Sequence, residues 1–99
     1  MVAREDFFER GWELVAEIPC GRVATYGQLA DMLGYPRHAR LAGAAMRHAP
    51  EGLPCHRVIA SDGSCAPSWP EQKMLLLREG VSFLPNGKAD LAHYRWEGL

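Results

Sequence analysis

The chain has 99 residues, 47% of them hydrophobic and 23% charged, which is the composition of a folded domain and not of a disordered or fibrous chain. The net charge is −1, which gives the chain as a whole no general affinity for nucleic acid. There is no run of about 18 apolar residues, and the charged first ten residues are unlike a signal peptide, so we expect a cytoplasmic protein without a membrane partner.

Hydrophobic spacing predicts a first helix over residues 4–18. A short β-prone run at 23–26 follows, and then a second helix over 27–34. After the turn at 35–36, residues 37–49 are expected to form a third helix. Two helices joined by a short turn are the pattern of a helix-turn-helix.

The third predicted helix has two different faces. Apolar residues gather on one side, and the opposite side carries Arg37, Arg40, Ala44 and Arg47. Residues 33–58 hold four arginines and one acid, whereas the rest of the chain holds seven basic and eleven acidic residues. A row of arginines with small residues between them is typical of a helix that enters a DNA groove. A solvated face chosen for solubility is the alternative.

The second half of the chain predicts a strand at 57–61, a turn at 61–64, a fourth helix over 70–80, and a tail with two β-prone runs around a turn at 85–88. The expected fold is mainly α with a small β wing. It is a winged helix-turn-helix, with residues 1–99 forming a single domain. Three methionines are expected in the core and not at a site: Met32, Met46 and Met74.

Cys55 lies beside His56 and Arg57 in the sequence EGLPCHRVIAS. A thiol is mostly protonated at neutral pH, and nearby cations or a general base convert it to the nucleophilic thiolate. Glu79 has the right chemistry to orient His56 as such a base. A buried, unreactive cysteine is the alternative. An odd number of cysteines and the lack of CxxC or HxxxH pairs argue against a disulfide framework and against a metal site.

Four segments, IPCGRVATYGQLA, RLAGAAMR, LPCHRV and REGV, occur in the order and close to the spacing of one family. The chain resembles the DNA-binding, active-site domain of the O6-alkylguanine-DNA alkyltransferases, and equally the smaller alkyltransferase-like proteins. The resemblance runs from about Phe7 to Val81. It implies a monomer that binds the minor groove of double-stranded DNA and rotates O6-alkylguanine out of the helix. It implies no cofactor and no metal, and other DNA-repair proteins as further partners.

The resemblance also implies residue roles. Cys55 would accept the alkyl group, His56 would act as base through a bridging water, and Glu79 would orient His56. Tyr26 would help to rotate the nucleotide and donate a proton to the purine, while Arg40 would fill the gap in the base stack. Further DNA-binding candidates are Arg37, Ala42, Gly43, Ala44, Ala45 and Arg47, and the loop and pocket candidates are Pro54, Arg57, Ser64, Ser68 and Trp69.

Three features set the chain between the two groups. Alkyltransferase-like proteins usually carry tryptophan or another residue where this chain has Cys55, and they bind lesions without transferring the alkyl group. Many alkyltransferases have a hinge asparagine near His48 and a glycine-rich loop where this chain has residues 64–70. Three hypotheses therefore stand: single-turnover alkyl transfer to Cys55, lesion binding that flags damage for another pathway, and a winged-helix transcription regulator. The third leaves the PCHRV and TYG segments without a role.

Overall fold

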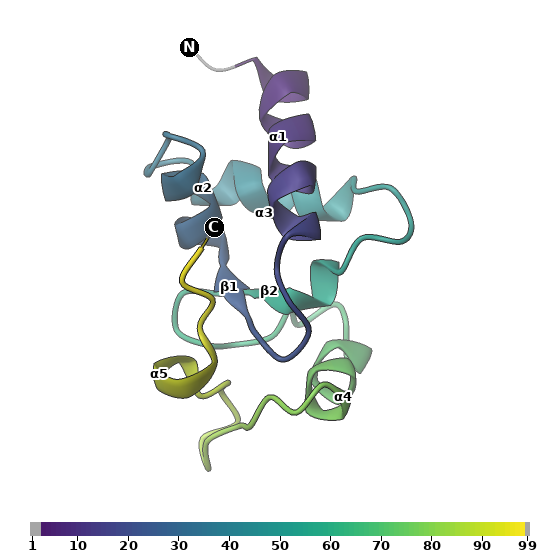
Figure 1. The fold of residues 1–99 in the computed structure, drawn as a ribbon, viewed down its shortest axis with the longest axis vertical. Coiled ribbons are helices and arrows are strands. Elements are labelled where there is room, and N and C mark those ends of the chain that lie inside the picture. Colours follow the sequence, from purple (N-terminus) through teal and green to yellow (C-terminus); the bar gives the residue numbers. More distant parts are fainter. Residues whose placement is uncertain (1–2, 99) are drawn as a thin grey trace.

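The computed structural model describes residues 3–98. The elements in chain order are α1 (Arg4–Ala16), β1 (Ala24–Thr25), α2 (Tyr26–Met32), α3 (Ala39–Arg47), the 3₁₀ turn η1 (Cys55–Arg57), β2 (Val58–Ile59), α4 (Glu71–Arg78) and α5 (Leu91–Tyr94). The helices α1, α2 and α3 pack together at one end of the molecule, α4 and α5 lie at the other end, and two short strands lie between them (Figure 1).

The main core lies where α3 packs against α1 and α2, and small side chains make this close packing possible. Ala42, Ala44 and Ala45 are 2%, 9% and 1% exposed, and the Trp12 indole N–H donates to the Ala45 carbonyl at 2.8 Å. All three alanines face the protein interior, since two neighbouring helices cover a wide arc of α3. This corrects the expected position of Ala44, which the helical spacing put on the arginine side, whereas Ala42 and Ala45 lie on the apolar side as the spacing predicts. The small size of the three alanines brings helix to helix, and Gly43 is the small residue left on the outer side.

A capping box and a parallel strand pair fix the start of α2. The Thr25 hydroxyl accepts from the Gln28 backbone N–H at 3.0 Å, and the Gln28 side chain accepts from the Thr25 backbone N–H at 3.4 Å. The helix therefore starts at Tyr26, one residue earlier than predicted. β1 pairs with β2 in register Ala24↔Val58 and Thr25↔Ile59. Because β1 runs directly into Tyr26 and β2 follows directly after η1, this pairing sets the position of Tyr26 relative to Cys55.

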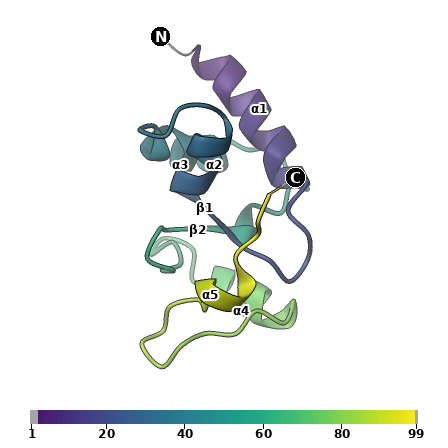
Figure 2. The same ribbon diagram turned by 60° about the vertical axis from the view of Figure 1, so that its left-hand side comes forward.

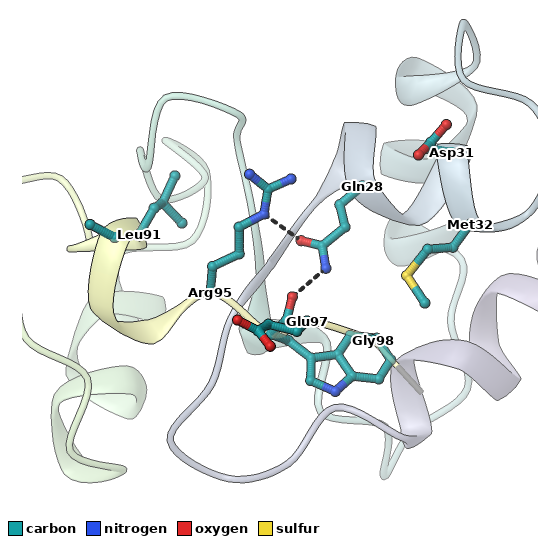
Figure 3. A pocket seen from close by; sticks show the side chains of 9 residues that line it. Gln28, Asp31, Met32, Leu91, Arg95, Glu97 and Gly98 are labelled. Carbon is teal, nitrogen blue, oxygen red and sulfur yellow. Dashed lines mark hydrogen bonds between the residues drawn. The ribbon is translucent and has the colours of Figure 1, made fainter.

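The C-terminal segment runs from α5 back towards the end of the molecule that holds α1, α2 and α3 (Figure 2). The backbone N–H of Trp96 donates to the carbonyl of Val23 at 2.7 Å, and the Trp96 ring is buried in the main core. The Gln28 amide joins this segment to α2, since it donates to the Trp96 carbonyl at 2.6 Å and accepts from Arg95 Nε at 3.2 Å (Figure 3). A cavity of about 860 Å³ lies between α2 and this segment.

The mainly helical fold with a small β component is confirmed, and the β component is smaller than predicted. The strand expected at 57–61 covers two residues, and the turn at 85–88 is flanked by a single antiparallel bridge, Phe83↔Ala89. The expectation for the methionines was wrong for Met32 and Met74, which are 38% and 57% exposed. No helix in the described part of the chain has the length and apolar character needed to cross a bilayer.

Candidate functional site

A cavity of about 750 Å³ lies between α3, η1 and the loop that connects β2 to α4. It brings together eight residues that the sequence singled out: Tyr26, Arg40, Gly43, Arg47, Cys55, Ser64, Ser68 and Trp69. Eight further residues line it: Ala39, Met46, Ala60, Ser61, Cys65, Ala66, Pro67 and Gln72. Of these, Met46 was expected in the core and not at a site; it packs against the core and also lines the cavity. The predicted residues outside the lining are Arg37, the three core alanines, Pro54, His56, Arg57 and Glu79.

Pro54 shapes the turn that carries Cys55 to the cavity. Its backbone angles, φ −79° and ψ 58°, are those of an inverse γ-turn, and the Cys55 N–H donates to the Leu53 carbonyl at 2.8 Å. The Arg57 N–H then donates to the Pro54 carbonyl at 3.0 Å and closes the 3₁₀ turn. Burial raises the pKa of the Cys55 thiol, so the thiol is protonated at neutral pH in the resting protein.

Behind this turn, one carboxylate binds both residues that follow Cys55. Glu79 Oε2 accepts from His56 Nε2 at 2.7 Å, and the Arg57 guanidinium donates through Nε and Nη2 to the two oxygens of Glu79 at 2.9 and 2.8 Å. Arg57 Nη1 donates in addition to the Ile18 carbonyl at 2.8 Å, which ties the turn to the end of α1. Since a carboxylate only accepts, His56 carries its proton on Nε2 and leaves Nδ1 as the basic nitrogen.

The hydrogen bonds from Arg57, together with that from His56, hold the pKa of Glu79 well below its usual range, at about 2. Glu79 is therefore ionised at neutral pH, and its negative charge can stabilise a protonated His56. The sequence could name Glu79 by type only, because 23 residues separate it from His56 and the end of α4 supplies the contact.

Tyr26 enters the cavity from the first position of α2. Burial raises the pKa of its hydroxyl; the nearby Arg47 opposes this rise, and Cys55 and Cys65 add to it. The hydroxyl thus stays protonated at neutral pH, with a proton to donate, in the same cavity as two thiols. Cys65, which the sequence gave no role, belongs to this group, and burial raises the pKa of its thiol as well.

The outer face of α3 supplies the positive charge at the cavity. Arg40 and Arg47 are exposed, line the cavity, and form no ion pair with any residue of the described chain. Arg37 is exposed just before α3 but does not line the cavity. Exposed guanidinium groups beside a cavity are suited to bind phosphates around a bound nucleotide.

The loop between β2 and α4 forms the opposite wall. Its tight turn depends on Gly63, at φ +91°, where an added Cβ would lie 2.9 Å from the carbonyl oxygen of Ala89. Gln72, which the sequence did not single out, reaches this wall from the first turn of α4 and is 1% exposed. The signal that could have found Gln72 is its spacing of four from the buried Leu76, which puts a polar side chain on the buried face of a helix.

Within residues 3–98, no three His, Cys, Asp or Glu side chains lie close enough together to hold a metal ion, and the three cysteines are free thiols. The groups present are two thiols and a phenol in one cavity, with His56 on the turn that carries Cys55 and bound to the carboxylate of Glu79 at the end of α4. Such groups can bind a planar polar molecule, and a thiol with a nearby base can accept a carbon group.

Residues 6–81 match the family model described as "6-O-methylguanine DNA methyltransferase, DNA binding domain". The chain is 42% identical to a protein named "DNA base-flipping protein" from Escherichia coli K12, over 97% of this chain and 78% of that protein. It is 38% identical to "Alkyltransferase-like protein 1" of Schizosaccharomyces pombe, over 94% of this chain and 96% of that protein.

Matches to full methyltransferases are shorter. The "Methylated-DNA--protein-cysteine methyltransferase" of Mycobacterium bovis is 43% identical over 59% of this chain, which is 36% of that protein. Among solved structures, S. pombe Atl1 in complex with damaged DNA containing O6-carboxymethylguanine superposes with a TM-score of 0.85 at 33% identity, and the match covers 98% of this chain and 99% of that one.

Proposed function

The chain belongs to the 6-O-methylguanine DNA methyltransferase family, and we propose that it is a DNA-repair protein that recognises O6-alkylguanine in duplex DNA. The observation that carries the proposal is the cavity of about 750 Å³ at the exposed arginines of α3, lined by Tyr26 and Cys55. The relative named for base flipping and the Atl1 complex with damaged DNA support the same function. In this proposal residues 1–99 act as one domain, as a cytoplasmic monomer without a cofactor.

Recognition requires the alkylated nucleotide to leave the base stack, which costs unstacking energy. In our proposal α3 lies in the minor groove, Arg40 fills the space that the nucleotide leaves, and Arg37 and Arg47 bind the flanking phosphates. The Tyr26 hydroxyl, which stays protonated, donates to the rotated purine, and Trp69 offers a face on which the base stacks. Ser64 and Ser68 are the remaining donors on the loop wall.

Alkyl transfer is the second candidate step, and the presence of a thiol in the cavity favours it. The Cys55 proton passes through water to His56, whose charge Glu79 stabilises. The sulfur then attacks the alkyl carbon, the bond from that carbon to the purine oxygen breaks, and guanine leaves with the electron pair. The product is a thioether that nothing regenerates, so each molecule reacts once. The raised pKa of Cys55 opposes this step, and lesion binding without transfer is the alternative.

The experiment that tests both steps uses a short duplex with one O6-methylguanine. The protein is weighed intact by mass spectrometry after incubation, and its affinity for this duplex is compared with that for the undamaged duplex. Tighter binding of the lesion duplex by wild type and by Cys55→Ala supports recognition, and equal affinity for both duplexes refutes it in favour of a winged-helix regulator. A gain of one methylene on the peptide with Cys55, absent in Cys55→Ala, establishes transfer. Lesion binding without this gain refutes transfer.

A further inference from the structure

Gln72 joins the two walls of the cavity through three hydrogen bonds to backbone atoms. On the side of the turn that carries Cys55, its Nε2 donates to the His56 carbonyl at 3.1 Å and to the Val58 carbonyl at 2.9 Å. Its Oε1 accepts from the backbone N–H of Ala66, at 2.7 Å, in the opposite loop. The side chain is 1% exposed and also lines the cavity, so both ends of its amide are used inside the protein.

No other hydrogen bond within residues 3–98 joins the 64–69 segment to η1 or to the residues of β2. The other backbone–backbone bonds of this segment are local: Ala60 N–H to the Ser64 carbonyl at 3.0 Å, Trp69 N–H to the Ala66 carbonyl at 3.1 Å, and Gln72 N–H to the Trp69 carbonyl at 3.1 Å. A planar amide that binds backbone on both sides holds those two backbones at one separation. Gln72 thus fixes how far the loop wall stands from the turn that carries Cys55.

We propose that Gln72 is the positioning residue that sets this cavity to the shape of the rotated alkylated base, and thereby sets the preference for lesion DNA over undamaged DNA. This inference rests on the proposed function. Gln72 acts through the Ala66 and His56 backbones, while Arg37 and Arg47, which bind flanking phosphates in our proposal, provide the affinity for DNA that does not depend on the lesion.

The test replaces Gln72 by methionine, which keeps the length of the side chain and removes all three hydrogen bonds. The matched control is Gln28→Met, because Gln28 also joins two segments but does so at the other cavity, beside Trp96 (Figure 3). That control keeps the hydrogen bond from the backbone N–H of residue 28 to the Thr25 hydroxyl and loses only the longer bond, at 3.4 Å, from the Thr25 backbone N–H to the Gln28 side chain. Dissociation constants are measured for the duplex with O6-methylguanine and for the undamaged duplex.

We expect Gln72→Met to lower affinity for the lesion duplex about tenfold or more, as the fixed geometry is lost. Affinity for undamaged DNA should stay within about twofold, because phosphate contacts supply it. Gln28→Met should keep the wild-type ratio of the two affinities. An unchanged ratio in Gln72→Met, or an equal fall in both variants, overturns the inference and leaves the proposed function standing. If the wild-type protein shows no preference for the lesion duplex, both the inference and the proposed function are refuted.

A second measurement needs no variant and applies even if Gln72→Met fails to fold. Hydrogen exchange in the wild-type protein should show the Ala66 amide slowed by about a hundredfold or more against an unstructured peptide, although it lies in a loop. An unprotected Ala66 amide overturns the inference.

If Gln72→Met does not fold, Gln72→Glu replaces it in the binding test. The carboxylate of this variant can still accept from Ala66 but cannot donate to the two carbonyls, so the same loss of lesion preference is expected, and a wild-type ratio again overturns the inference.

Discussion

Replacing Glu79 by glutamine tests whether the carboxylate that binds Arg57 and His56 stabilises the fold around the nucleophile. Glutamine has the shape of a protonated glutamate, but one of its two terminal atoms is an NH2 group that cannot accept, so the variant removes the negative charge together with at least one of the three hydrogen bonds that Glu79 accepts. The pKa of Glu79 is lowered from 4.5 to about 2, chiefly by the hydrogen bonds from Arg57. A shift of this size corresponds to about 3 kcal/mol at neutral pH. Because each of the three side chains keeps 16–17% of its surface exposed, solvent screening reduces the expected loss to about 1–2 kcal/mol.

The sign of the pH dependence follows from the direction of the shift. The folded state binds the Glu79 proton less tightly than the unfolded state does, so the stabilisation is complete above the unfolded pKa of about 4.5 and is lost as the pH falls towards 2. Urea unfolding of wild type and Glu79→Gln should therefore differ by about 1–2 kcal/mol at pH 7 and by much less at about pH 2.5.

The control is Glu9→Gln, which changes an exposed glutamate on α1 and should leave stability within about 0.5 kcal/mol of wild type. A difference between wild type and Glu79→Gln that stays the same from pH 7 to about pH 2.5 would show that packing, and not the ion pair, explains the loss. No difference at pH 7 would refute the stabilising role of the charge altogether.

Three further changes test the cavity. Arg40→Ala should weaken binding to lesion DNA more than to undamaged DNA, and titrations at several salt concentrations should show a slope reduced by about one if Arg40 also binds a phosphate. Tyr26→Phe should lower lesion affinity about tenfold in the same titrations while the melting temperature stays within a few degrees, since only the hydroxyl is removed. Gly63→Ala should cost about 2–4 kcal/mol in urea unfolding, because its Cβ would lie 2.9 Å from the Ala89 carbonyl oxygen at φ +91°; a cost below about 0.5 kcal/mol would show that the loop adjusts freely.

Local sequence signals predicted most of the helical half of the fold. The hydrophobic spacing of α1 and the short break between α2 and α3 were enough to predict these three helices, because the helices bury apolar faces against one another. The face of α3 was predicted less well. A helical wheel put Ala44 on the arginine side, whereas α1 and α2 together cover enough of α3 to bury it.

The candidate site was predictable where it follows the chain and unpredictable where it depends on distant contacts. Pro54, Cys55 and His56 are consecutive, so their turn could be recognised from the sequence. The contact between His56 and Glu79 and the bridge made by Gln72 depend on where α4 packs, which no local pattern specifies. α5 has four residues, too few to show a periodic pattern.

The parallel pairing of β1 with β2 has a consequence for how this chain tolerates changes in length. The pairing holds residues 24–26 and 55–59 together. Tyr26 and Cys55 therefore keep their separation when the loops that lead away from these segments change in length. Residues gained or lost at 48–52 would change only the path into the turn. One residue inserted between Arg57 and Val58 would instead shift the strand register and turn Val58 and Ile59, both fully buried, to the opposite faces. Variation in loop length is therefore tolerated on one side of Cys55 and excluded on the other.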